Sequence, residues 1–218
     1  KCFEKIVLRI LSGSIGDVCD QLQFAYKKNR GVEDAVLTLL NTVYKHLEKK
    51  GTYVRILFVD FSSAFNTIQA HLMIQKLKRF NVNNNIILWV YDFLSHRPQY
   101  VRLNSIVSDV KFTNTGAPQG CVLSPVLFTI YTDDCRKNCP ECIMPKYADD
   151  TAIVGLVVEY YRNFINEFVD WCDANFLDFN VIKTKEMIID FRRIDKSVEH
   201  EPIVVKGQTI EIVHVYPY

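Results

Sequence analysis

The sequence predicts an α+β fold with an antiparallel sheet at its centre. Helix-like and strand-like segments follow one another without the regular β-α-β alternation that builds a parallel sheet. The chain has 218 residues, of which 49% are hydrophobic and 23% are charged, as in globular domains. At this length packing alone can stabilise the fold, so disulfides and structural metals are not required.

Two helices are predicted near the start of the chain. Apolar residues recur at helical spacing over residues 3–11, and the serines and glycines of residues 12–16 predict the end of that helix. The second helix is predicted over residues 33–50. Glu33 and Asp34 give it an acidic first turn, an apolar stripe follows, and two lysines close it.

A buried strand is predicted at residues 53–59, with the sequence Y-V-R-I-L-F-V. Both of its faces are mainly β-branched, aliphatic or aromatic, which is typical of a strand in the centre of a sheet. Asp60 follows it directly. Two further helices are expected over residues 70–80 and 85–95, the second of which ends before Pro98.

Three hairpins are predicted from residue 99 onward. The first pairs residues 99–103 with 107–113. In the second, strands at residues 142–147 and 151–157 are joined by the tight turn A-D-D, which places carboxylates at its tip. The remaining elements are helices over residues 122–131 and 160–174, a strand at 187–191 and a hairpin at 206–208.

Charge is balanced over the whole chain, with 26 Lys and Arg against 25 Asp and Glu, so bulk basicity gives no argument for nucleic-acid binding. The two halves differ. Residues 1–110 hold 15 basic and 9 acidic residues, whereas residues 111–218 hold 11 and 16. This split fits a basic surface for a polyanion beside an acidic site that needs metal ions, and chance produces similar splits equally often.

The seven cysteines are an odd number and are spread along the chain, with no secretory leader before them. We therefore expect reduced thiols in an intracellular protein, in the cytoplasm or nucleus. Cys135, Cys139 and Cys142 form a cluster without a fourth nearby Cys or His, which disfavours a closed zinc site. No apolar stretch approaches the roughly 20 residues of a membrane span, so no membrane partner is expected. The first residue is Lys, which suggests a piece of a longer chain.

Three carboxylates are candidates for a metal site. Asp60 follows the buried strand, and Asp149 and Asp150 lie at the hairpin tip, so side-by-side packing of these strands would bring them together. Like charges at close range raise each other's pKa, and a divalent cation relieves the repulsion. Few hard oxygen ligands suit two Mg²⁺ ions, with Mn²⁺ as a substitute, in phosphoryl transfer. From spacing alone, an ordinary turn and a strand-end cap remain the commoner interpretation.

Three stretches carry a family resemblance. They are V-D-F-S-S-A-F-N-T-I at residues 59–68, N-T-G-A-P-Q-G-C-V-L-S-P at 114–125 and K-Y-A-D-D-T at 146–151. In this order they resemble the A, B and C motifs of reverse transcriptases. They are similar in particular to the non-LTR (LINE-type) retrotransposon enzymes of the jockey-like group. Residues 171–185 resemble the D motif of that family, and residues 1–7 and 21–26 resemble its fingers segments.

The resemblance implies the fingers and palm of a right-hand polymerase around the central antiparallel sheet, with the thumb absent. It assigns residues 1–52 to the fingers, 53–80 to the palm, 81–113 to a fingers-palm connection and 114–218 to the palm again. The family continues beyond such an end into a primer grip and a thumb. An endonuclease domain is expected in the full-length protein.

Site residues follow from the same resemblance. Asp60 and Asp149 bind the metal ions, with the main-chain oxygen of Phe61 as a further ligand and Asp150 completing the acidic cluster. Phe65 lies under the sugar of the incoming nucleotide, where its ring leaves no room for a 2′-hydroxyl. Without the motif, Phe65 reads as an ordinary core aromatic.

The remaining assignments concern the nucleotide and the nucleic acid. The nucleotide-binding set comprises Gly116, Pro118, Gln119, Gly120 and Lys183, with Lys183 near the leaving pyrophosphate. The nucleic-acid set comprises Lys27, Lys28, Arg30 and Tyr147. Taken alone, G-A-P-Q-G is only a turn, and the lysines are ordinary solvated side chains.

The implied function is an RNA-directed DNA polymerase that uses an RNA template, a DNA primer and dNTPs. The oligomeric state is left open. A different class of function is an inactive or repurposed remnant that binds nucleic acid or a protein partner without catalysis. An RNA-templated RNA polymerase is a third interpretation, but such enzymes usually place a smaller or polar residue at the position of Phe65.

Overall fold

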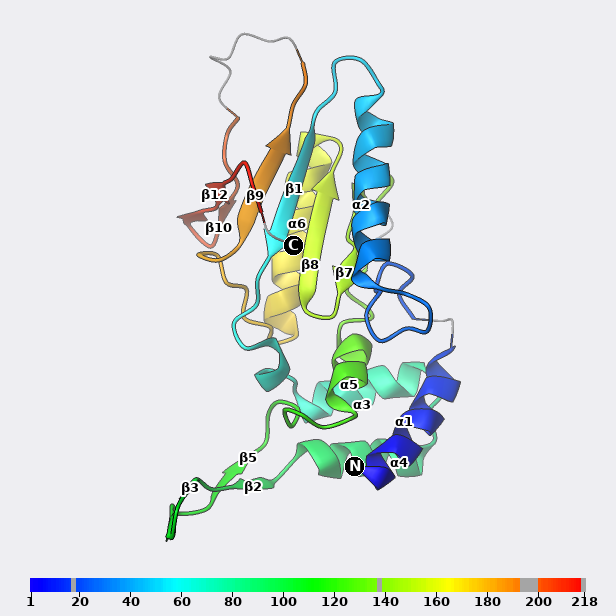
Figure 1. Ribbon diagram of the computed structural model, residues 1–218, viewed down its shortest axis with the longest axis vertical. Coiled ribbons are helices and arrows are strands. Elements are labelled where there is room, and N and C mark those ends of the chain that lie inside the picture. The colour runs from blue at the N-terminus through cyan, green and yellow to red at the C-terminus, as the bar shows by residue number, and fades with distance from the viewer. Residues whose placement is uncertain (17–18, 137–138, 193–199, 217–218) are drawn as a thin grey trace. The chain divides into compact units, whose positions relative to one another are not determined.

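A computed structural model describes residues 1–16, 19–136, 139–192 and 200–216 of the chain (Figure 1). The chain forms two compact units. The helical unit comprises Lys1–Cys19, Ser63–Asp134 and Asn175–Leu177. The sheet unit comprises Asp20–Ser62, Cys135–Ala174 and Asp178–Tyr218. Each unit is therefore assembled from segments that are far apart in the sequence.

The sheet unit is built on a mainly antiparallel sheet with the strand order β12-β9-β1-β8-β6, and β7 also pairs with β8. The strands are β1 (Val54–Val59), β6 (Cys142–Ile143), β7 (Lys146–Tyr147), β8 (Asp150–Gly155), β9 (Lys185–Ile189) and β12 (Glu211–Ile212). Among the strands described in this sheet, β12, which the sequence did not predict, is the one that pairs in parallel, with β9. The predicted α+β class with an antiparallel central sheet is confirmed.

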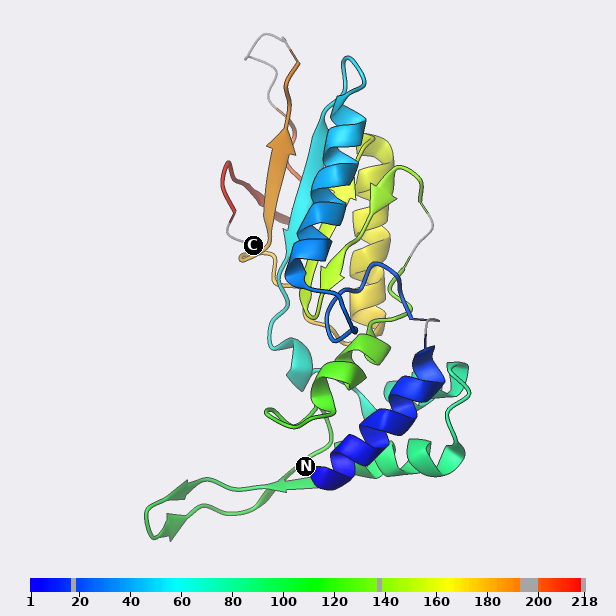
Figure 2. The ribbon, with the colours of Figure 1, turned by 45° about the vertical axis from the view of Figure 1, so that its right-hand side comes forward.

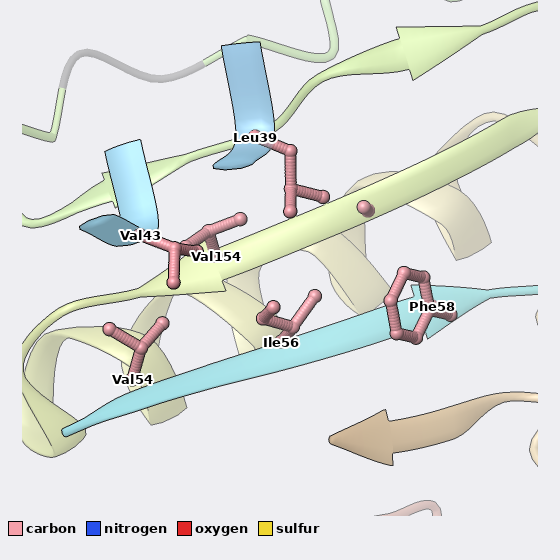
Figure 3. Close-up of a cluster of buried hydrophobic side chains, with 7 residues drawn as sticks. Leu39, Val43, Val54, Ile56, Phe58 and Val154 are labelled. Carbon is pink, nitrogen blue, oxygen red and sulfur yellow. The ribbon is translucent and has the colours of Figure 1, made fainter. Parts of the chain in front are cut away.

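Helices cover both faces of this sheet (Figures 1 and 2). On one face, Leu39 and Val43 of α2 (Val32–Leu47) pack against alternate residues of β1 and against β8 (Figure 3). On the other face lies α6 (Val158–Ala174), whose Tyr161 is fully buried. All six residues of β1 are consequently buried, as its apolar sequence predicts.

A buried ion pair lies between neighbouring strands of the sheet. Arg55 of β1 donates two hydrogen bonds to the carboxylate of Glu186 on β9, each 2.8 Å long. It also donates to the main-chain oxygen of Glu201, and its guanidinium lies 5.8 Å from the ring centroid of Tyr161. The two charged side chains are at most 3% exposed. Such a pair is stable only while both partners are present.

The helical unit contains α1 (Cys2–Ile15), the short 3₁₀ helix η2 (Ala64–Asn66), α3 (Ala70–Arg79), α4 (Asn84–Leu94) and α5 (Ser124–Tyr131). Helix α3 packs against both α4 and α5. Helix α1 joins them through Phe3, whose ring lies 5.2 Å from that of Trp89, and through Glu4, which accepts a hydrogen bond from the amide of Val122.

A hairpin extends from the end of α4 within the same unit (Figure 2). It consists of β2 (Arg97–Gln99) paired with β5 (Lys111–Thr113), and β3 (Arg102–Leu103) paired with β4 (Ile106–Val107). The predicted hairpin is confirmed, but its ladder is interrupted. Three residues, 108–110, lie opposite the two residues 100–101, which is the arrangement of a β-bulge.

Several boundaries differ from the prediction: α2 ends at Leu47 and not at residue 50, α5 begins at Ser124 and not at 122, and β8 ends at Gly155 and not at 157. Helix α1 continues past Leu11 to Ile15, because Val7, Leu11 and Ile15 form one buried stripe that outweighs Gly13. The predicted strand at 142–147 is split into β6 and β7, with Pro145 between them, which has no amide hydrogen to donate. The predicted strand at 187–191 is shifted two residues toward the N-terminus, to Lys185–Ile189.

The hairpin predicted around residues 206–208 is present as β10 (Val204–Val205) and β11 (Gln208–Thr209). Its two turn residues, Lys206 and Gly207, both have positive φ, as a tight hairpin turn requires. In the described ranges, no helix is both long and apolar enough to cross a bilayer. The family resemblance implies a primer grip beyond the last residues of this chain. The last two of these residues, 217 and 218, lie outside the described residues.

The buried ion pair gives a stability prediction. Replacing Glu186 by Gln leaves the guanidinium of Arg55 without a counter-charge in the interior, which should lower the free energy of unfolding by about 3–5 kcal/mol. Urea denaturation followed by circular dichroism measures this change. The matched control is Glu201→Gln, because the Glu201 side chain is 79% exposed and pairs only at the surface with Arg162. Its loss should stay within about 1 kcal/mol. Equal losses in the two variants would contradict the role given to the buried pair.

Candidate active site

The register of the central strands brings the three predicted carboxylates to one end of the sheet. Val59 of β1 pairs with Thr151 of β8, so the next residues, Asp60 and Asp150, lie at the same end of the two antiparallel strands. Tyr147 pairs with Asp150, which leaves only Ala148 and Asp149 in the turn between β7 and β8. The predicted juxtaposition is confirmed. Asp150 belongs to the strand rather than to the turn itself.

The turn that carries Asp149 is held by a side chain that the sequence analysis missed. Ala148 has φ of 59°, which is unfavourable for a residue with a Cβ atom. The buried side chain of Gln23 accepts a hydrogen bond from the amide of Ala148 at 3.1 Å and donates one to its carbonyl at 3.2 Å. The segment around Gln23 is aligned by main-chain bonds to Lys146. Gln23 lies in the stretch Q-L-Q-F-A-Y, the one signal that could have indicated it.

Lys146, the residue before Tyr147, also anchors the turn that carries Asp149. Its ammonium is buried and lies 2.7 Å from a carboxylate oxygen of Asp20, and it donates a hydrogen bond to the main-chain oxygen of Cys135. A buried charge is tolerated when it is paired and hydrogen-bonded in this way. The lysine of the K-Y-A-D-D-T motif therefore supports the turn.

Asp60 is fixed through its main chain by the segment that resembles a D motif. Its amide donates to the hydroxyl of Thr184 at 3.1 Å, and its carbonyl accepts from the amide of Asn180 at 2.9 Å. Thr184 in turn closes a turn with Asn180. Thr184 was not among the predicted site residues. Lys183 lies in this turn with its side chain exposed.

The negative charges of the three carboxylates, Asp60, Asp149 and Asp150, interact unfavourably with one another. The pKa of Asp150 is raised above its ordinary value, first by partial desolvation and then by the negative charges of Asp149 and Asp60. The pKa of Tyr216 is raised by burial and by the charges of Asp150 and Asp60. Carboxylates close enough to perturb each other repel one another, which is the situation that a cation relieves.

One buried oxygen atom of these three carboxylates has no hydrogen-bond partner among the described residues. Oδ2 of Asp60 is buried and accepts no hydrogen bond from the residues that the structure describes. A buried acceptor without a partner costs free energy unless a ligand satisfies it. Within the described ranges, no three His, Cys, Asp or Glu side chains are assembled to hold one ion. A few hard oxygen donors fit Mg²⁺, which binds one or two carboxylates and completes its shell with water and phosphate.

In the helical unit, the structure brings Phe65 together with the predicted nucleotide-binding loop. We call residues 116–120, G-A-P-Q-G, the B loop. The amide of Gly116 donates to the carbonyl of Ile68 at 2.7 Å, and the amide of Ala117 donates to that of Phe65 at 2.8 Å. The Phe65 ring is half-buried and lies 4.8 Å from the ring of Phe128.

Glycine at position 116 is a steric requirement. Its φ is +77°, and an added Cβ would lie 2.8 Å from the Cα of Asn66. Pro118 is fixed through its carbonyl, which accepts a hydrogen bond from the hydroxyl of Ser124. Gln119 and Gly120 are exposed. The loop is thus anchored at its start and presents its glutamine outward.

The predicted nucleic-acid residues differ in their surroundings. Lys28 is exposed, whereas Lys27 donates to the main-chain oxygen of Asp20. Arg30 donates to the main-chain oxygen of Gln21 at 2.7 Å and stacks over the ring of Phe24. These contacts order the loop before α2. Tyr147 is half-buried.

Comparison with known proteins agrees with these arrangements. A family model described as "Reverse transcriptase (RNA-dependent DNA polymerase)" matches residues 1–210. The RNA-directed DNA polymerase from the mobile element jockey of Drosophila melanogaster is 26% identical over 233 residues, covering 100% of this chain and 25% of that protein. A probable RNA-directed DNA polymerase from transposon BS of the same species is 23% identical, covering 83% of this chain and 22% of that protein.

Among solved structures, apo telomerase from Candida tropicalis superposes with a TM-score of 0.68 at 12% identity, covering 95% of this chain and 39% of that chain. Identity this low shows a shared fold and nothing more. The chain spans about a quarter of the length of the curated relatives it matches. Since the family model covers nearly all of its residues, the chain belongs to the reverse transcriptase (RNA-dependent DNA polymerase) family.

Proposed function

We propose that this chain is the catalytic part of an RNA-directed DNA polymerase that adds dNTPs to the 3′-hydroxyl of a primer. The observation that carries the proposal is the cluster of three carboxylates, Asp60, Asp149 and Asp150, at one end of β1 and β8. Within this cluster, Oδ2 of Asp60 is buried without a hydrogen-bond partner among the described residues. Membership of the reverse transcriptase family supports it.

The cofactor in this proposal is Mg²⁺, as two ions, for which Mn²⁺ can substitute. Asp60 and Asp149 would hold the ions, with the main-chain oxygen of Phe61 and the carboxylate of Asp150 as further oxygen donors. Bound there, the ions would stabilise the attacking and leaving oxygens of an in-line displacement. The hard oxygen donors and the raised pKa of Asp150 support this assignment.

The remaining roles belong to other side chains of the chain. Phe65 would exclude a 2′-hydroxyl by steric contact, and Gln119 would position the nascent base pair with its donor and acceptor groups. Lys183 would place positive charge near the leaving pyrophosphate, for which its exposed side chain is free to move.

The partners in this proposal are an RNA template, a DNA primer and dNTPs. Lys28 would contact phosphates without reading sequence. We further propose that the full-length protein carries an endonuclease domain and acts inside the cell, in the cytoplasm or nucleus. The division into fingers, palm and connection also stays a proposal.

The first prediction for this site concerns Asp149. The variant Asp149→Asn keeps the shape of the turn residue but removes its charge, so primer extension by the full-length protein should fall at least about a hundredfold. Extension of a labelled DNA primer on an RNA template with dNTPs and Mg²⁺ measures the rate. The control Asp170→Asn changes an exposed carboxylate on α6 and should leave the rate unchanged. Robust extension by the Asp149 variant would refute the metal assignment. A wild-type protein that extends no primer with either Mg²⁺ or Mn²⁺ would favour the non-catalytic remnant.

A second prediction concerns sugar selection. Replacing Phe65 by Val opens space below the sugar, so the preference for dNTPs over rNTPs should weaken by about tenfold or more, since a lost steric clash is worth at least a kcal/mol or so. The ratio of kcat/KM for the two nucleotides measures it. The control Phe191→Val removes an exposed aromatic of the sheet unit. An unchanged ratio in the Phe65 variant would leave Phe65 as a packing residue only. Efficient rNTP use by the wild-type protein would instead favour an RNA polymerase.

A further inference from the structure

Arg97 links the projecting hairpin to the B loop within the helical unit. It is the first residue of β2, and its backbone is held by pairing with Thr113 of β5. Its side chain continues beyond this pair toward the loop. There Nη2 donates to the main-chain oxygens of Thr115 and Gly116, at 2.8 Å in the case of Gly116. No motif in the sequence analysis included Arg97.

The same stretch of backbone is held from its other edge by the segment that carries Phe65. The amides of Gly116 and Ala117 donate to the carbonyls of Ile68 and Phe65, as described above. The amides at the start of the B loop are therefore fixed by the Phe65 segment, and the adjoining carbonyls are fixed by Arg97. Without Arg97, the start of the loop would keep its bonds to the Phe65 segment, and the hydroxyl of Ser124 would still hold Pro118, but the carbonyls of Thr115 and Gly116 would lose the hydrogen bonds from the guanidinium.

The geometry at this position favours an arginine. The two hydrogens of Nη2 lie in the guanidinium plane and can serve two neighbouring carbonyl oxygens at once. Nε of Arg97 is buried and makes no hydrogen bond within the described residues, so part of the group is desolvated without compensation. This burial also lowers the pKa of Arg97 below its ordinary value. A surface arginine would avoid such a cost.

We propose that Arg97 is a positioning residue of the nucleotide site, which holds the B loop against the Phe65 segment. This rests on the proposed function, because the loop then presents Gln119 to the incoming nucleotide. Arg97 touches neither the nucleotide nor the reacting atoms in this arrangement. Its effect is to fix the distance between the loop and the aromatic ring that checks the sugar.

The first test measures the loop directly, by hydrogen exchange of individual amides in the full-length protein. In Arg97→Gln, exchange at Gly116 and Ala117 should accelerate at least about tenfold, because a hydrogen bond from a charged donor is lost. Arg97→Lys keeps the charge but not the planar pair of hydrogens. Its exchange rates at Gly116 and Ala117 should therefore lie between those of the wild-type protein and those of Arg97→Gln. The matched control is Arg102→Gln, an exposed arginine of the same hairpin, which should leave both amides protected.

Amides of α3 and α4 serve as the folding reference. If Arg97→Gln loses protection throughout these helices, the helical unit of that variant is unfolded. The exchange of Gly116 and Ala117 in Arg97→Lys then decides whether Arg97 holds the loop. Unchanged protection of Gly116 and Ala117 in a folded Arg97 variant overturns the proposal.

The second test asks whether the loop position matters for the reaction. In primer extension, Arg97→Lys should raise the KM for dNTPs about tenfold with a smaller change in kcat, and should weaken the discrimination against rNTPs. A purely structural role would lower the amount of active enzyme and leave both KM and discrimination unchanged. That result, with the amide protection lost, would also overturn the proposal. A wild-type protein without polymerase activity refutes the proposed function instead, and the exchange of Gly116 and Ala117 then still decides whether Arg97 holds the loop.

Discussion

The antiparallel pairing of β1 with β8 is the contact on which the candidate active site depends. It alone places Asp60 at the same end of the sheet as Asp150, although 90 residues separate them in the sequence. A shift of one residue would turn every side chain of the strand to the opposite face. Because β1 is apolar on both faces, hydrophobic pattern specifies this register only weakly. The ion pair between Arg55 and Glu186 constrains the register of β1 against its other neighbour, β9, since a shift there would leave both charges buried and unpaired.

The carboxylates themselves contribute little to holding their own site together. Their mutual repulsion opposes the fold, and the backbone around them is fixed from outside by Gln23 and Thr184. These supporting residues satisfy main-chain groups and leave the carboxylate of Asp60 available. An arrangement of this kind separates the residues that provide rigidity from those that provide charge. The B loop follows the same principle, with Ile68 and Arg97 as its supports.

Periodicity predicted the helices and most strands, because burial of one face or both leaves a local pattern. The convergence of Asp60 with Asp149 and Asp150 could also be predicted, since each followed or joined a recognisable strand. The contact between Gln23 and Ala148 could not, because it joins residues 125 positions apart through an amide side chain. The end of α1 was missed because burial of Ile15 outweighs local helix-breaking residues. Strand β12 has only two residues, too few for any periodic signal.

The sheet also imposes an order on synthesis. Strand β1 leaves the ribosome after α2, which covers one of its faces, but both of its strand partners, β8 and β9, are made much later. Residues 63–134, most of the helical unit, are made in between. Folding of that unit first would shorten the effective loop that β1 and β8 must close, and so lower its entropic cost. Until then both edges of β1 lack their strand partners and its second face lacks α6, so the partly made chain exposes an aggregation-prone segment that the finished fold buries completely.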